Sequence, residues 1–163
     1  MNKGKIPLQV VEFKGKIMAV VDCLIMYNFK KVPAEFIIDT GASVTALSLK
    51  EAYRLDIVFE SLPYYSKPVA GIGGTVSDTR VIKDVSLVFS DDEGKEVIFY
   101  LEEVPIYKPQ KIKRKEIDRY DPEIKVKILE AYPNILGINV LRESILYIDF
   151  HNKEGYIILE GNI

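Results

Sequence analysis

Cysteine, histidine and tryptophan are nearly absent from this sequence of 163 residues, which has one cysteine, one histidine and no tryptophan. A single cysteine, Cys23, excludes a disulfide within the chain and a cysteine-based zinc finger. A single histidine, His151, excludes a histidine-rich catalytic zinc site and leaves little room for a Ser-His-Asp or Cys-His arrangement. If the protein is an enzyme, carboxylates are therefore the expected acid and base groups.

Long apolar runs and a strong excess of one charge are also missing. The basic start lacks the continuous apolar stretch of a secretory signal, and the run 17–27 is interrupted by Asp22 and is too short to span a bilayer as a helix. We therefore expect no membrane contact and a cytoplasmic location. The net charge of -2 argues against a general nucleic-acid coat. The length predicts a single domain over residues 1–163.

Short strands separated by turn signals dominate the sequence and predict an all-β or mostly β domain. The expected strands are 8–13, 17–27, 34–38, 69–72, 75–82, 85–89, 97–104, 145–150 and 156–159. Expected helices are 48–55, where Ser48 and Glu51 have the spacing of a capping box, 121–132, and a short turn over 140–144.

The stretch 108–119, KPQKIKRKEIDR, differs from the rest because it holds six basic and two acidic residues. We interpret it as part of a surface insertion at about 105–133. A solvated surface is the favoured interpretation of this charge, and contact with nucleic acid or an acidic partner is the alternative.

One segment has the pattern of a chemical site, because an apolar strand leads directly into Asp39-Thr40-Gly41-Ala42. Glycine permits a turn there that a side chain would obstruct. The pattern places a carboxylate at the end of a buried strand, within reach of backbone amides. An ordinary Asp-Thr-Gly turn is the alternative interpretation.

Two later segments make this alternative less favourable. Gly71-Ile72-Gly73-Gly74 has the composition of a hairpin tip, suited to a flap over a cleft, although alone it also fits a plain turn. The segment 134–141, NILGINVL, is an apolar strand that reaches a glycine and then a short helical turn, and alone it fits ordinary core. The three segments in this order, followed by a strand pair, are not ordinary.

In these segments the sequence resembles the retroviral-type (retropepsin-like) aspartic proteases. The resemblance is carried by 39–42, 71–74 and 135–141, and its strand order extends over roughly 8–159 apart from the insertion. It implies a closed, mostly β acid-protease barrel with a short C-terminal helix, to which this chain adds one inserted helix.

The resemblance also implies roles for individual residues. Asp39 would be the catalytic carboxylate, Thr40 a hydroxyl that bonds across two copies of the loop, and Gly41 the close-packing turn residue. The implied substrate-binding residues are Ala42, Gly71, Ile72, Gly73 and Gly74, the last four belonging to the flap.

The Asp-Thr-Gly motif occurs once, whereas aspartic protease chemistry needs two carboxylates that share one proton. Two chains related by a two-fold axis supply that pair. We therefore expect a homodimeric aspartic endopeptidase in which the two Asp39 carboxylates activate water against a peptide bond of a protein or peptide substrate. This chemistry needs no metal and no organic cofactor.

Two other functions stay open at this stage. A non-catalytic retropepsin-like dimerisation or peptide-binding module would keep the fold without cleavage, but the intact Asp39, Thr40 and Gly41 favour the enzyme. An adaptor for nucleic acid rests on the basic insertion alone. We expect His151 in an exposed turn, Cys23 in the core and 91–93 in a solvated hairpin turn rather than a calcium loop.

Overall fold

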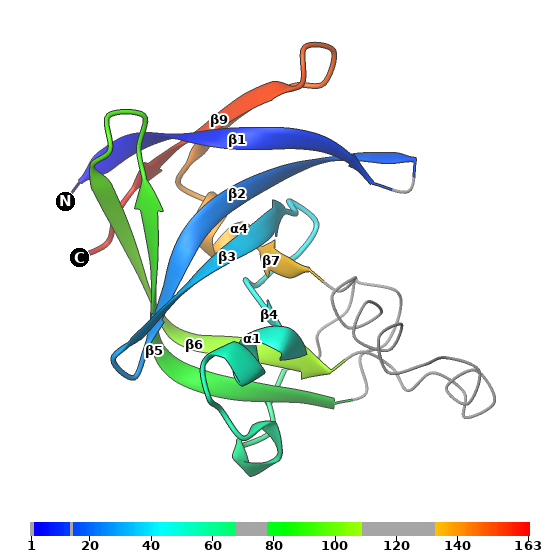
Figure 1. Cartoon of the computed structure of the whole chain (residues 1–163), viewed down its shortest axis with the longest axis vertical. Coiled ribbons are helices and arrows are strands. Elements are labelled where there is room, and N and C mark those ends of the chain that lie inside the picture. The colour runs from blue at the N-terminus through cyan, green and yellow to red at the C-terminus, as the bar shows by residue number, and fades with distance from the viewer. Residues whose placement is uncertain (1, 14, 68–77, 109–132) are drawn as a thin grey trace.

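The computed structural model describes residues 2–13, 15–67, 78–108 and 133–163, and these form a mostly β structure (Figure 1). The strands are β1 (Lys3–Phe13), β2 (Lys16–Tyr27), β3 (Lys30–Ile38), β4 (Leu47–Ser48), β5 (Asp78–Ser90), β6 (Glu96–Lys108), β7 (Asn134–Leu136), β8 (Ile145–Asp149) and β9 (Glu154–Glu160). The helical elements are α1 (Leu49–Arg54), the 3-10 turn η1 (Phe59–Ser61) and α4 (Ile138–Leu141). The predicted mostly β class is confirmed.

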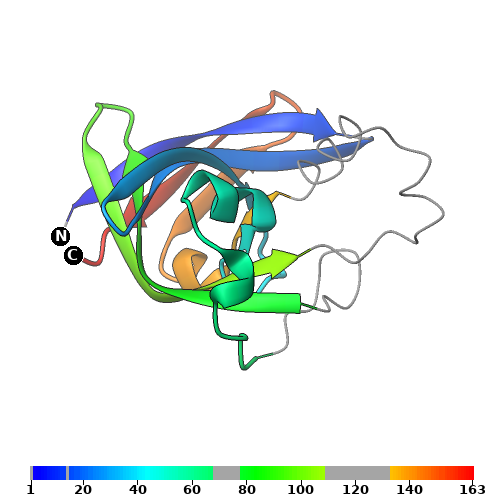
Figure 2. The same cartoon turned by 60° about the horizontal axis from the view of Figure 1, so that its bottom comes forward.

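Strand β2 is the centre of the sheet because it pairs with β1, β3 and β5. Strand β3 runs antiparallel to it from Val20 to Tyr27. The opposite edge pairs with β1 near the start of β2 and with β5 over Leu24–Met26. The sheet therefore divides at β2 into one part containing β1, β9 and β8 and another containing β5, β6 and β4, as Figures 1 and 2 show.

The predicted closed barrel is wrong. The strand order is β4-β6-β5-β2-β1-β9-β8, and the two end strands of this path do not pair with each other. Among the described strands, the edge of β3 away from β2 is extended only by β7, which has three residues and leads through Gly137 into α4. Because the chain turns into a helix there, no ladder within the described ranges continues from β7 to close the sheet.

Alternating side chains place the apolar core between the two parts of the sheet. On β2, Val21 and Ile25 are fully buried and Asp22 is exposed, as expected of a strand with one face in the core. Phe36 on β3 is also fully buried. Truncation of a buried phenylalanine typically costs about 3–5 kcal/mol of folding free energy, so this face fixes the position of β3 firmly.

Several predicted element boundaries need correction. The described part of the expected strand 75–82 and the expected strand 85–89 belong to one strand, β5, because pairing with β6 continues past Asp84. The capping box is also wrong, because α1 begins after Ser48 without a side-chain cap hydrogen bond. The strand 69–72 and the helix 121–132 lie outside the described residues. In the described part of the chain, no helix is long and apolar enough to cross a membrane.

Candidate active site

Asp39 follows the last residue of β3, and its position is set by two neighbouring segments. Strand β7 runs parallel to β3, with Ile38 opposite Leu136, and the Asp39 N–H donates a 3.1 Å hydrogen bond to the Leu136 carbonyl. Asp39 itself is half-buried. The strand pair therefore delivers a carboxylate to the edge of the core, where one side of it remains accessible.

Residues 39–42, which we call the Asp39 loop, form a tight turn. The Gly41 N–H donates to Asp39 Oδ1 at 2.9 Å, and the Ala42 N–H donates to the Asp39 carbonyl at 3.2 Å. A Cβ added at Gly41 would lie 3.2 Å from Asp39 Oδ1, so glycine leaves space beside the carboxylate. Thr40 and Gly41 are exposed. The turn holds the carboxylate by one oxygen and exposes the residues next to it.

The far side of the Asp39 loop is joined to α4. The Ile138 N–H donates to the Ala42 carbonyl at 2.8 Å. At Gly137 a Cβ would lie 2.4 Å from the Val44 carbonyl oxygen and 2.9 Å from the Thr45 nitrogen, so only glycine allows these two backbones to approach. The segment 134–138 therefore supports the Asp39 loop at both ends.

A buried hydroxyl, that of Thr45, adds hydrogen bonds between α4 and the segment that follows the Asp39 loop. Thr45 donates from its N–H and from Oγ1 to Asn139 Oδ1, each at 2.8 Å, and its Oγ1 accepts from the Gly137 N–H at 3.0 Å. Thr45 is almost fully buried, so these bonds satisfy groups that water does not reach. Sequence reasoning missed Thr45 and Asn139, although each is a polar residue in an apolar segment, which is a usable signal.

A second polar cluster lies at the start of β7. Asn134 is fully buried, donates to the Glu35 carbonyl at 3.1 Å and to Glu51 Oε1 at 3.2 Å, and accepts from the Ser48 N–H at 3.0 Å. Glu51, also fully buried, pairs with Arg54 Nη1 at 2.9 Å. Ser48 and Glu51 thus contact Asn134 instead of forming the expected capping box.

A third contact group lies at the start of β5. The Arg80 guanidinium donates to Asp78 Oδ1 at 2.8 Å and to the Leu62 carbonyl at 2.9 Å, and it lies 3.9 Å from the centre of the exposed Tyr64 ring. Tyr64 therefore packs on Arg80. The predicted flap residues Gly71, Ile72, Gly73 and Gly74 precede this strand and lie outside the described residues.

Cys23, His151 and residues 91–93 have the surroundings predicted for them. Cys23 is buried, and its burial raises the pKa of the thiol, with nearby Asp22 adding to the effect, so it is a packing residue rather than a nucleophile. His151 is exposed in the β8–β9 turn. In the β5–β6 turn, Asp91 Oδ1 accepts from the N–H groups of Glu93 and Lys95.

Within the described ranges no group of three or more acidic, histidine or cysteine side chains could hold a metal.

The sequence profile of the aspartyl protease family matches residues 25–100, a range that contains the Asp39 loop. This match and the fold confirm the resemblance to the retropepsin-like aspartic proteases, and they support a protease function in general terms.

A solved structure gives the likeness in detail. The chain is similar to a retropepsin-like aspartic protease from Rickettsia conorii, with a TM-score of 0.55 and 17% sequence identity over 98% of this chain and 93% of that one. At this identity the likeness concerns the fold. Comparison of the sequence with curated proteins gives no match.

Proposed function

We propose that the protein is a homodimeric aspartic endopeptidase whose active site contains one Asp39 from each copy. The observation that carries the proposal is the position of Asp39. Its carboxylate is fixed through one oxygen by the Gly41 N–H, in a turn joined to β7 and α4. A carboxylate held this way in two copies around an axis is suited to share one proton.

The reaction proceeds by general acid–base catalysis. The unprotonated Asp39 of the pair accepts a proton from water as the water oxygen forms a bond to the peptide carbonyl carbon. The protonated Asp39 of the other copy donates its proton to the leaving nitrogen as the C–N bond breaks. The pair ends with one proton, as it began, so the cycle balances without a cofactor.

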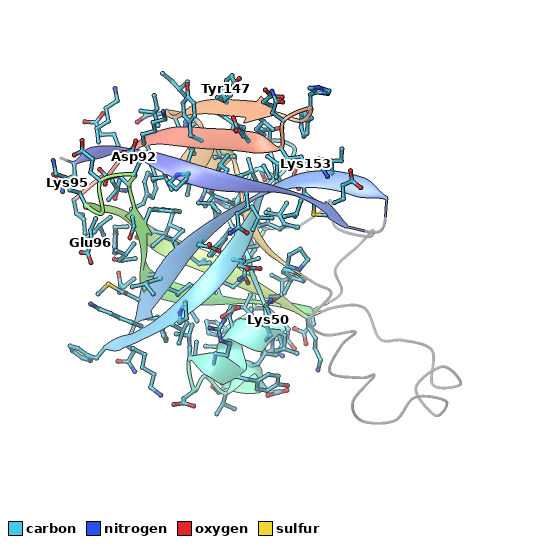
Figure 3. All side chains as sticks on the ribbon, turned by 45° about the horizontal axis from the view of Figure 1, so that its top comes forward. Lys50, Asp92, Lys95, Glu96, Tyr147 and Lys153 are labelled. Atoms are coloured by element: carbon cyan, nitrogen blue, oxygen red, sulfur yellow. The ribbon has the colours of Figure 1, made fainter. Side chains whose placement is uncertain are left out.

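An unpaired, apolar sheet edge supports the dimer. Among the described strands β8 pairs only with β9, and it carries Ile145 and Tyr147, which are 59% and 47% exposed. Figure 3 shows Tyr147 on this outermost strand. Soluble proteins normally protect such an edge with charge or cover it, because it offers free backbone groups to another strand. Antiparallel pairing of β8 with its copy covers the edge and follows two-fold symmetry.

The decisive experiment compares the wild-type protein with Asp39→Asn for cleavage of peptides at acidic pH. The variant keeps the size of the side chain and an acceptor for the Gly41 N–H, but it cannot act as the base. We expect its activity to fall by at least about 100-fold. Asp92→Asn, in the exposed β5–β6 turn, is the matched control and keeps full activity.

Two outcomes contradict the proposal. Equal cleavage by the wild type and Asp39→Asn removes the mechanism. Absence of cleavage by both proteins across a diverse peptide library favours the second candidate, a dimerisation or peptide-binding module with the same fold. The single-domain organisation over 1–163 and the substrate-binding role of Ala42 and of 71–74 belong to the same proposal.

A further inference from the structure

We infer that Asn134 is a positioning residue that sets the register of β7 and thereby the position of Asp39; as a statement about catalysis, this rests on the proposed function. The need for such a residue follows from the strand itself. β7 has only three residues, and all three are buried, including Ile135 and Leu136. Register in a sheet is normally set by a buried face and an exposed face. In a strand buried on both faces, a shift by one residue moves no side chain from the core to solvent, so burial alone does not set the register.

The hydrogen bonds of Asn134 favour the observed register of β7 over a shifted one. Its two amide protons go to the Glu35 carbonyl and to Glu51 Oε1, and its oxygen accepts from the Ser48 N–H at 3.0 Å and from Ser48 Oγ at 3.4 Å. Both donor positions and both acceptor positions of the amide are used. A shift of β7 by one residue would place Ile135 against these polar groups and leave them buried without partners.

The partners of Asn134 come from three different elements, and a half-buried ion pair holds one of them. Glu51 of α1 accepts from Arg54 Nη1 at 2.9 and 3.1 Å, which orients its carboxylate toward Asn134. The Arg54 side chain is partly exposed beside a cavity of about 520 Å³ that Lys50 also lines, so water reaches the cationic side of the pair. The Glu51 carboxylate therefore presents a fixed acceptor to Asn134.

The register of β7 determines two backbone contacts at or near the Asp39 loop. Leu136, two residues after Asn134, provides the carbonyl that accepts from the Asp39 N–H at 3.1 Å. The next residue, Gly137, makes the close approach to Val44. Both contacts require β7 in this register. Asn134 thus acts on the carboxylate without touching it, through the backbone of β7.

The test uses Asn134→Asp in the full chain, which keeps the shape but replaces the donor facing Glu51 with a carboxylate oxygen. Amide hydrogen exchange is measured at Asp39 and at Val81, whose N–H bonds to the Pro63 carbonyl at 3.0 Å away from β7. We expect protection at Asp39 to fall at least about tenfold more than at Val81. Peptide cleavage should lose kcat with KM nearly unchanged. Asn162→Asp is the matched control, because Asn162 is an exposed asparagine that is hydrogen-bonded to the Tyr100 backbone. It should change neither the protection of the Asp39 N–H nor the kcat of peptide cleavage.

A milder variant keeps the test decisive if Asn134→Asp does not fold. Glu51→Gln removes the charge that Arg54 orients, and it should lower protection at Asp39 selectively but to a smaller extent. Equal losses at Asp39 and Val81 in the folded variants would overturn the inference, since they indicate general destabilisation. If the wild type cleaves no peptide, the proposed function fails, but the exchange measurement still decides whether Asn134 sets the register.

Discussion

Gly137 shows how a single missing side chain controls the candidate site. A Cβ at this position would lie 2.4 Å from the Val44 carbonyl oxygen, which belongs to backbone and cannot rotate away. Any side chain there must separate α4 from the segment that follows the Asp39 loop. The Thr45 hydroxyl, which accepts from the Gly137 N–H, would lose its partner in the same movement.

We therefore predict that Gly137→Ala lowers the free energy of unfolding by about 2–4 kcal/mol, measured by urea denaturation. Gly94→Ala is the control. Gly94 has a φ of +81° and open space around its Cα, so alanine there incurs only the cost of a left-handed conformation, about 1–2 kcal/mol. A loss in Gly137→Ala no larger than in the control would show that the two backbones separate easily.

At the scale of elements, the β8–β9 hairpin is closed by a charged turn. Asp149 accepts from the Asn152 N–H at 2.9 Å and from its side-chain amide at 2.8 Å, and these bonds, the backbone one first, lower the pKa of the Asp149 carboxyl. Because the pKa is lower in the folded state, the carboxylate stabilises the fold above its ordinary pKa of about 3.9. That stabilisation disappears as pH falls through the folded-state pKa.

Asp149→Asn should therefore be less stable than the wild type at neutral pH, and the difference should shrink as the pH falls below about 4. Thermal unfolding over a pH series measures it. Asp92→Asn, in the exposed β5–β6 turn, serves as the reference for a general change in charge. A difference that stays constant down to acidic pH would contradict the assigned hydrogen bonds.

The edge strand β8 gives a second prediction for an element. Tyr147→Lys places a charge on the proposed dimer edge of each copy, next to the stacked Tyr156 ring 5.1 Å away. Like charges brought together across an interface oppose association, so we expect the dimer dissociation constant to rise at least about tenfold. Sedimentation velocity at several concentrations measures the change.

Phe29→Lys is the matched control for this edge, because Phe29 is a fully exposed aromatic residue in the β2–β3 turn. It should leave the dissociation constant unchanged. If Tyr147→Lys and the wild type sediment alike, β8 is not the dimer edge.

Local sequence signals predicted the parts of the site that depend on neighbouring residues. The strand before Asp39, the turn at Gly41 and the strand–glycine–helix order around Gly137 are all found as expected. The polar contacts were not predicted, because Thr45 and Asn139 are 94 residues apart and Glu51 and Asn134 are 83 apart. A capping-box pattern describes only short-range partners, so it misassigned Ser48 and Glu51, whose contacts are distant in sequence.

At the scale of the whole molecule, the proposed site is shared, which makes a defective copy an inhibitor. A heterodimer of wild type and Asp39→Asn contains one competent carboxylate and should not cleave. In an equal mixture of exchanging subunits, random pairing leaves about half of the original number of wild-type dimers. We therefore predict that adding an equal amount of Asp39→Asn lowers the cleavage rate to about half.

This mixing experiment has a clear internal control. The Asp39→Asn/Tyr147→Lys double variant loses the aromatic side chain at the proposed edge, so it should pair more weakly with the wild type and inhibit less than Asp39→Asn alone. If the single Asp39→Asn variant leaves the rate unchanged after long incubation, either the subunits do not exchange or one copy suffices. A rate that depends linearly on protein concentration down to full dissociation of the dimer would identify the second case.

The position of β9 between β1 and β8 has a consequence for the order of folding. β1 and β9 stand at opposite ends of the sequence, yet they pair from Lys3–Glu160 to Gln9–Glu154. A ribosome finishes β1 long before β9, so one edge of β1 must wait for nearly the whole chain to be synthesised. Only after β9 has joined can β8 be displayed at the edge. If β8 is the dimer edge, as proposed, a nascent chain is unable to dimerise through it, and the proposed protease activity would begin only after synthesis has passed β9.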